Sequence, residues 1–148
     1  MRFLLVDRIT EIEKGKRAAG IKNVTLSEDF FAFHFPEHPI MPGALIAECL
    51  VQLADWTVRD NEDFEFVAVA SAFDTIKFHN LVRPGDQLHL EVEVTGRENG
   101  DYFFRGEARC CGRVMAAGRF TMSVHPAGDL QPAEEGRRLY KMIRCGEA

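Results

Sequence analysis

The feature that most constrains the fold is a long apolar stretch that begins directly after a proline-rich turn. Residues 34–43 read HFPEHPIMPG, and in the stretch that follows, 44–54, only two side chains are polar. Pro42 suits a first helical turn, because the N–H group that proline lacks has no intrahelical partner there. We therefore predict a helix over about 42–59 that is apolar around most of its circumference and largely buried. The rest of the chain must cover it.

The remaining segments read mostly as strands that could cover such a helix. In residues 88–94, LHLEVEV, leucine and valine alternate with polar residues, which predicts a strand with one buried face. Residues 64–78 are nearly continuously apolar, as in a strand covered on both faces. The Asn-Gly pair within 97–101 is a strong hairpin signal. We further predict a strand over 18–26, an irregular segment over 29–43, a turn over 83–87, a meander of strands over 102–110 and 113–124 that turns at Cys111-Gly112, and a short helix over 132–143.

One buried helix combined with long antiparallel strands predicts an α+β fold. The 148 residues contain no repeat or linker, so we predict a single domain with a short C-terminal extension over about 126–148. One helix cannot cover every face of such a sheet, and the uncovered faces favour a homodimer.

Composition and charge argue against several classes of function. The formal net charge of −5 argues against a nucleic-acid-binding surface. The apolar stretch over 44–54 is too short to span a bilayer, and the first residues, MRFLLVDR, lack the long apolar segment of a signal peptide. The four cysteines show neither zinc-ligand spacing nor a CxxC motif. We therefore expect a cytoplasmic protein with reduced thiols, no membrane contact and no nucleic-acid partner.

The proline-rich turn and the helix together resemble a known signature. Residues 30–52, FFAFHFPEHPIMPGALIAECLVQ, are similar to the pattern GHFPxxPxMPGxLxxE/DxxxQ of the hot-dog-fold 3-hydroxyacyl-[acyl-carrier-protein] dehydratases, the FabZ/FabA group. Segments 4–31 and 73–88 resemble the opening and the second block of that family, so the likeness spans about 3–124. Phe33 stands where the family usually has glycine. The positions that match in register are His34, Phe35, Pro36, Pro39, Met41, Pro42, Gly43, Leu45, Glu48 and Gln52.

The resemblance implies a hot-dog fold, in which an antiparallel sheet wraps one long central helix, and the elimination of water from a 3-hydroxyacyl thioester to give a trans-2-enoyl thioester. His34 would remove the C2 proton, since an imidazole titrates near neutrality. Glu48, in an apolar pocket that disfavours its charged form, would protonate the leaving hydroxyl. The N–H of Gly43 at the helix start would stabilise the thioester oxygen, and Gln52 would orient Glu48. By the same resemblance, Glu48 would reach across a dimer interface to the partner's His34.

The resemblance also implies an acyl carrier and no resident cofactor. The substrate would arrive on phosphopantetheine, as a thioester of acyl carrier protein or coenzyme A, at a homodimer or a higher oligomer. The cluster of Lys77, His79 and Arg83 would steer an acidic carrier protein to the tunnel mouth, although these residues fit a solvated turn equally well. The residues expected to line the substrate tunnel are Phe33, Phe35 and Met41.

These roles have alternatives. Glu48, Gln52, Asp55 and Arg59 fall at helical spacing, a pattern that without the signature is typical of a solvated face. His34 and His38 have the i, i+4 spacing of a metal pair, but the prolines argue against a helix there and no third ligand is evident, so we predict no metal site. Two functions remain open besides dehydration. They are a hot-dog acyl thioesterase, which would activate water, and a non-catalytic acyl-carrier-binding subunit.

Overall fold

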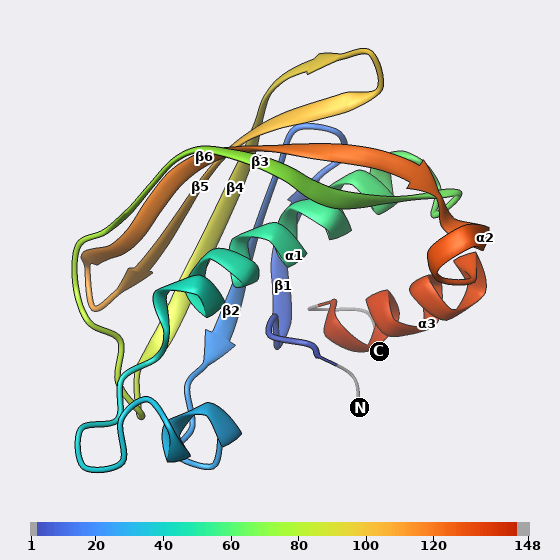
Figure 1. The fold of residues 1–148 in the computed structure, drawn as a ribbon. Coiled ribbons are helices and arrows are strands. Elements are labelled where there is room, and N and C mark those ends of the chain that lie inside the picture. The colour runs from blue at the N-terminus through green and yellow to red at the C-terminus, as the bar shows by residue number, and fades with distance from the viewer. Residues whose placement is uncertain (1–2, 145–148) are drawn as a thin grey trace.

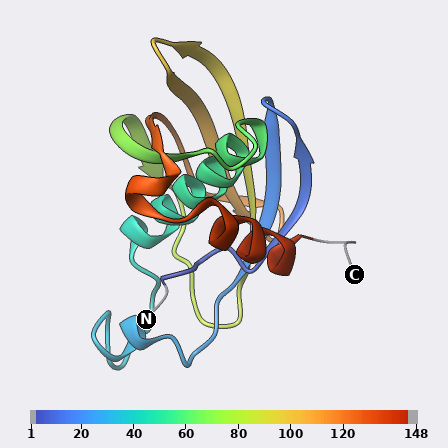
Figure 2. The same cartoon turned by 90° about the vertical axis from the view of Figure 1, so that its right-hand side faces the viewer.

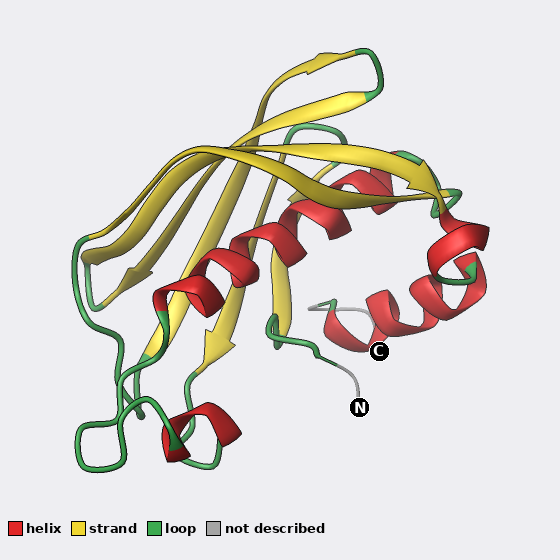
Figure 3. Ribbon diagram, in the orientation of Figure 1, coloured by secondary structure: helices red, strands yellow, loops and turns green. Residues whose placement is uncertain are grey.

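The computed structural model describes residues 3–144 and contains a six-stranded antiparallel sheet curved around a long helix, α1 (Gly43–Asn61) (Figure 1). The strands lie in the order β1-β2-β4-β5-β6-β3 and form one layer, with α1 on its concave side (Figure 3). This confirms the predicted α+β hot-dog arrangement and extends the predicted helix of 42–59 by two residues at its end. The strands are β1 (Arg8–Glu13), β2 (Arg17–Asn23), β3 (Phe66–Phe78), β4 (Gln87–Glu98), β5 (Asp101–Cys110) and β6 (Arg113–Pro126).

The hydrophobic core lies between α1 and the concave face of the sheet. Leu50 and Leu53 of α1 are fully buried there. In β4, Leu88 and Leu90 are also fully buried, whereas the polar residues between them and after them are exposed. The alternation read from 88–94 therefore predicted the buried face of this strand correctly.

Two tight hairpins connect β4, β5 and β6. Asn99 and Gly100 have φ values of 53° and 86°, and Cys111 and Gly112 have φ values of 51° and 75°. Positive φ at both central residues is the geometry of a type I′ turn, whose twist matches the twist of the flanking strands. The two predicted turns of the meander are confirmed.

β3 is an edge strand, and this corrects one prediction. It pairs with β6 on one side and with no strand of the described residues on the other. Phe66, Val69, Phe73 and Phe78 are between 37% and 49% exposed. The prediction that 64–78 is covered on both faces is therefore wrong for a single chain. Its apolar side chains lie instead along an open sheet edge, which folded proteins usually cover or protect.

The opposite edge of the sheet is β1, a strand that the sequence reading missed. Its residues RITEIE are mostly polar and exposed, and only Ile9 is fully buried. A polar edge of this kind resists further pairing and leaves a weak periodic signal. The strand predicted over 18–26 is β2, which ends at Asn23. Within the segment predicted as irregular, Asp29–Ala32 form a short 3₁₀ helix, η1.

The C-terminal extension folds back beside α1 (Figure 2). It contains α2 (Ala127–Leu130), which was not predicted, and α3 (Ala133–Ile143), which confirms the helix predicted over 132–143. The ring of Tyr140 packs against those of Trp56 and Phe64, at centroid distances of 5.9 and 5.2 Å. The extension thus covers the C-terminal half of α1. Among residues 3–144, none of the helices is both long and apolar enough to span a bilayer.

Candidate active site

His34 lies in the loop before α1, and the loop backbone sets the orientation of its ring. The ring Nδ1 lies 2.9 Å from the carbonyl oxygen of Ile40. Because a carbonyl oxygen only accepts hydrogen bonds, Nδ1 is the donor, and in the neutral ring Nε2 keeps its lone pair. The N–H of Ile40 donates to the His34 carbonyl oxygen at 3.0 Å, and the Phe35 ring stacks on the imidazole at 4.3 Å. His34 therefore offers Nε2 as a proton acceptor.

Glu48 lies in the second turn of α1 and is held by Gln52, one turn further on. The Nε2 of Gln52 donates to Glu48 Oε1 and to the carbonyl oxygen of Phe3, both at 3.0 Å. The Oε1 of Gln52 accepts the N–H of Leu5 at 2.8 Å, which fixes the end of the amide that faces Glu48. The N-terminal segment therefore orients Gln52, and the predicted contact between Gln52 and Glu48 is present.

Glu48 faces an apolar groove of about 350 Å³ between α1 and β3. Glu48 is the only ionisable residue among those that line the groove. Three of the lining residues are alanines, whose small side chains leave space in it. Such a space suits a slender apolar chain that brings a reactive group to one carboxyl. The groove is lined by Ala44, Ala47, Glu48 and Val51 from α1 and by Ala70, Phe73, Ile76 and Phe78 from β3.

The start of α1 is the third part of the predicted site. The carbonyl oxygen of Pro42, the N-cap, accepts the N–H groups of Leu45 and Ile46 at 2.9 and 3.3 Å. The N–H of Gly43 has no acceptor among the described residues, as is usual in a first helical turn. The Phe78 ring covers Gly43 so closely that a Cβ there would lie 3.0 Å from it. In a single chain, the Phe78 ring therefore occupies the space that a side chain at position 43 would need.

The structure does not bring His34 and Glu48 into one pocket of a single chain. His34 is not among the residues that line the groove of Glu48. The groove borders the open sheet edge, where Phe73 and Phe78 are largely exposed. A site shared between two chains accommodates this separation, and it stays a prediction.

The three residues expected to line a substrate tunnel lie outside this groove. Phe33 is 80% exposed at the tip of its loop, and Met41 is buried in the core. Phe35 borders a separate surface hollow together with Leu81 of the facing loop. A tunnel lined by Phe33 and Phe35 would need a second chain to cover these exposed rings, and the tunnel role of all three residues stays a prediction.

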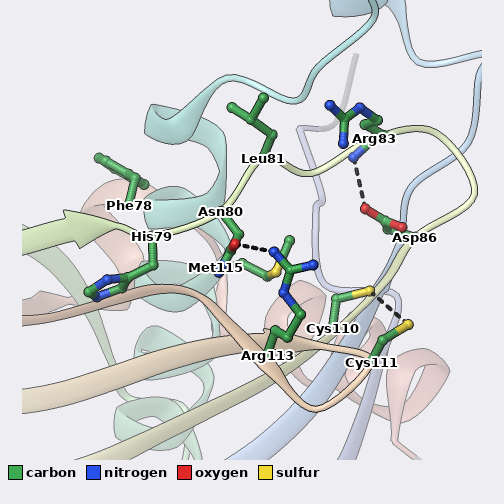
Figure 4. A pocket seen from close by; sticks show the side chains of 10 residues that line it. All are labelled: Phe78, His79, Asn80, Leu81, Arg83, Asp86, Cys110, Cys111, Arg113 and Met115. Atoms are coloured by element: carbon green, nitrogen blue, oxygen red, sulfur yellow. Dashed lines mark hydrogen bonds between the residues drawn. The ribbon is translucent and has the colours of Figure 1, made fainter.

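Two of the three residues expected to meet a carrier line a hollow of about 510 Å³, shown in Figure 4. These are His79 and Arg83, whereas Lys77 on β3 is exposed outside it. Sequence reasoning missed Arg113, which enters the same hollow from β6 and donates to the Asn80 side chain. The predicted turn at Cys111-Gly112 could have indicated this residue. Because β6 pairs with β3, the residues that follow the turn lie beside the end of β3. Cationic groups from two segments thus gather here.

The C-terminal part of the polar stripe on α1 is not a solvated face. Asp55 Oδ2 accepts from Arg59 Nε at 2.8 Å, and Asp55 Oδ1 accepts the N–H of Ala68 in β3 at 2.7 Å. Arg59 Nη1 donates to Gln131 Oε1 at 2.7 Å. The Asp55 and Arg59 side chains are only 18% and 11% exposed. Burial raises the pKa of the Asp55 carboxyl, and the Arg59 guanidinium opposes that rise.

Among the described residues, this site offers neither a reactive cysteine nor a cluster of metal ligands. Cys49 follows Glu48 in the sequence but is fully buried, and burial raises the pKa of its thiol to about 12. A thiol with this pKa is a poor nucleophile at neutral pH. Within residues 3–144, no three His, Cys, Asp or Glu side chains are placed to hold a metal ion, and His38 is an exposed turn residue.

Comparison with known proteins places the chain in a family. A family model described as a FabA-like domain matches residues 1–119. Several curated relatives are named 3-hydroxyacyl-[acyl-carrier-protein] dehydratase FabZ. The one from Caldanaerobacter subterraneus is 50% identical over 116 residues, 78% of this chain and 82% of the relative. The one from Bacillus subtilis is 48% identical over 115 residues, 73% and 82% of the two chains. The one from Bacillus licheniformis is 45% identical over 123 residues, 82% and 85% of the two chains.

Solved structures share the fold at low identity. The dehydratase heterocomplex ApeI:P from Xenorhabdus doucetiae matches with a TM-score of 0.59 and 18% identity, over 76% of this chain and 92% of that chain. A thioesterase superfamily member from Thermus thermophilus matches with a TM-score of 0.65 and 17% identity, over 87% and 93%. These likenesses show the hot-dog fold alone. Because the family model spans most of the chain, including the loop of His34 and the whole of α1, this chain belongs to the FabA-like family.

Proposed function

We propose that this chain dehydrates 3-hydroxyacyl thioesters to trans-2-enoyl thioesters in fatty-acid biosynthesis or a related lipid or polyketide route. The observation that carries the proposal is the carboxyl group of Glu48, which Gln52 holds in an apolar groove. The relatives named as dehydratases support it. The reaction uses no resident cofactor, because the phosphopantetheine arm arrives with the substrate.

His34 acts as the base in this reaction. Its Nε2 takes the proton from C2, and the ring becomes an imidazolium with N–H groups at both nitrogens. The Nδ1–H group keeps its hydrogen bond to the Ile40 carbonyl oxygen throughout, so the ring does not turn during the proton transfer. The electron pair left on C2 moves toward the thioester carbonyl, and the free N–H of Gly43 stabilises the oxygen on which the negative charge develops.

Glu48 acts as the acid. Its Oε1 accepts the hydrogen bond from Gln52, so the proton for the leaving group is carried on Oε2. Transfer of that proton to the C3 hydroxyl breaks the C3–O bond and releases water. The electron pair of the enolate then forms the C2–C3 double bond. The enzyme returns to its starting state when His34 loses its proton and Glu48 regains one.

The proposed active form is a homodimer that the open edge of β3 supports. The exposed Phe66, Val69, Phe73 and Phe78 offer an apolar surface along a strand that has free backbone groups. A second copy on this edge would cover the groove and supply the partner's His34 to Glu48. Acyl carrier protein or coenzyme A would deliver the substrate, with His79 and Arg83 facing an acidic carrier, and the expected location is the cytoplasm.

The test is turnover of a model 3-hydroxyacyl thioester, followed by the absorbance of the conjugated enoyl product. His34→Ala and Glu48→Gln should each lower kcat by a factor of roughly 10² to 10⁴ while leaving the protein folded. The matched controls are His38→Ala, an exposed histidine of the same loop, and Glu91→Gln on the exposed face of β4. Near-normal rates in both site variants would falsify the site assignment.

Further measurements distinguish dehydration from the two alternative functions and test the shared site. Release of free thiol without enoyl absorbance would identify a thioesterase, and binding of the acyl carrier without turnover would identify a carrier-binding subunit. Mixing the inactive His34→Ala and Glu48→Gln proteins should restore part of the activity, because one hybrid site then keeps both groups. No recovery despite confirmed subunit exchange would contradict a site shared between chains.

A further inference from the structure

Polar groups lie just beyond the groove of Glu48, toward the C-terminal half of α1. Val51 and Ala70 are the lining residues nearest to the C-terminal half of α1. One helical turn after Val51 comes Asp55, and two residues before Ala70, on the same face of β3, comes Ala68. The Asp55 carboxylate accepts the Ala68 N–H at 2.7 Å. This hydrogen bond joins the two walls of the groove where the apolar lining ends.

The polar groups beyond the groove are bonded to one another. The second carboxylate oxygen of Asp55 accepts from Arg59 Nε at 2.8 Å, and Arg59 Nη1 donates to Gln131 at 2.7 Å. The guanidinium also lies over the Trp56 ring, 5.0 Å from its centroid. An alkyl chain that extended further would have to break the bond between Asp55 and Ala68 and place methylene groups against a mostly buried ion pair, which is unfavourable.

We propose that Asp55, Arg59 and Gln131 form a polar stop that limits the length of the acyl chain this enzyme accepts. The inference rests on the proposed function, because it takes the groove of Glu48 as the place of the acyl chain. That occupant fits the lining, which is aliphatic and aromatic apart from the one carboxyl group. Methylene groups that fit between Glu48 and the polar stop favour binding, and the first that does not fit reduces kcat/KM roughly tenfold or more.

The C-terminal extension takes part in the polar stop. Gln131 lies between α2 and α3, beyond residues 1–119 that match the family model. Its side chain holds the guanidinium of Arg59, and Arg59 in turn holds Asp55 against β3. Gln131 is therefore a positioning residue for the polar stop, whereas Asp55 and Arg59 form the barrier itself.

The test measures kcat/KM for 3-hydroxyacyl thioesters of increasing chain length. For the unchanged chain we expect a sharp decline beyond one length. In Asp55→Ala/Arg59→Leu both charges are removed together, so the ratio of long-chain to short-chain kcat/KM should rise at least about tenfold. Gln131→Ala should shift the ratio in the same direction by a smaller factor. The control Glu93→Ala/Arg105→Leu removes an exposed ion pair between β4 and β5 and should leave the profile unchanged.

The dependence of kcat/KM on acyl chain length distinguishes a barrier to long chains from a contact that only stabilises the fold. A merely structural role for the ion pair would lower kcat/KM by the same factor at every length, and that result would overturn the proposal. A groove filled by a second copy instead of substrate would likewise leave the profile unmoved. If the double variant does not fold, Gln131→Ala decides the matter alone. An unchanged chain that dehydrates all lengths equally overturns the polar stop, whereas one that dehydrates none overturns the proposed function itself.

Discussion

The two halves of α1 differ in what surrounds them. The N-terminal half, 43–51, faces the apolar groove of Glu48, and the N–H of Gly43 in its first turn has no acceptor among the described residues. The C-terminal half, 52–61, is tied down by side-chain contacts: Arg59 bonds to Gln131 at 2.7 Å, Asp60 accepts from Tyr140 at 2.9 Å, and Asn61 donates to Tyr102 at 2.8 Å. One continuous helix therefore has an open end and an anchored end.

This difference shows how a helix can border unfilled space at one end and still keep its side chains in fixed positions. A ligand groove needs unfilled space and unpaired donors, and both of these lower stability locally. A helix transmits rigidity along its length, because every turn is hydrogen-bonded to the next. Contacts at the C-terminal half, far from Glu48, can therefore fix the position of the N-terminal half.

The largest expected effect comes from removing the aromatic anchor of the C-terminal half. Trp56 is buried between Arg59 and Tyr140, so Trp56→Ala should lower the free energy of unfolding by about 3–5 kcal/mol. Phe33→Ala removes an exposed ring and should cost less than about 0.5 kcal/mol. Urea denaturation measures both. Equal losses in the two variants would show that the C-terminal half is not the anchored end.

The next effect concerns the junction of the halves, where Gln52 holds Glu48. Gln52→Leu removes the bond to Glu48 Oε1 and leaves the N–H of Leu5 without its acceptor. Because a small misplacement of a catalytic group is costly, kcat should fall on the order of 10²-fold. Gln87→Leu, which removes an exposed glutamine bonded to Asn23, is the matched control. An unchanged kcat in Gln52→Leu would argue that Glu48 needs no positioning.

The sequence predicted the elements whose signals are local. Pro42 predicted the start of α1 within one residue, the alternation of 88–94 predicted the buried face of β4, and Asn99-Gly100 predicted a hairpin. These signals depend on backbone geometry and on periodicity, which a short stretch of chain determines by itself. The roles predicted for His34 and Glu48 came from the resemblance to a family signature, because no local pattern around either residue indicates them.

What the sequence could not predict are contacts between distant segments. The alternative that Asp55 and Arg59 belong to a solvated face is wrong, and no nearby residue indicates the contact with Gln131, which lies 72 residues after Arg59. The apolar β3 was interpreted as covered on both faces, yet among the described residues it is an edge strand with exposed apolar side chains. The pattern of β3 indicated its hydrophobicity correctly but could not show whether the strand is central or at an edge of the sheet.

A third prediction contrasts two neighbours within the N-terminal half. Glu48 faces the groove, whereas Cys49 points into the core, where burial raises the pKa of its thiol from 9.0 to about 12. Between these values the unfolded chain has released the thiol proton and the native chain has kept it, so stability falls as pH rises. At one pH unit above 9.0 the loss amounts to about 1.4 kcal/mol.

The measurement compares the unchanged chain with Cys49→Ala in urea, under reducing conditions, at pH 8 and pH 10. The variant lacks the thiol, so the difference in unfolding free energy between the two proteins should shrink by about 1.4 kcal/mol over this range. A difference that stays constant with pH would mean that the thiol titrates alike in the folded and unfolded chains and does not point into a dry core.

The smallest expected effect separates packing from hydrogen bonding at the anchored end. Tyr140→Phe keeps the ring against Trp56 and Phe64 and removes the donor to Asp60, so the free energy of unfolding should fall by only about 1 kcal/mol. Asp60→Ala should add little in the Tyr140→Phe background, since the two side chains share one bond. Urea denaturation of both single variants and the double variant gives this coupling. A loss in Tyr140→Phe as large as that of Trp56→Ala would mean that polar contacts, rather than aromatic packing, hold the extension on α1.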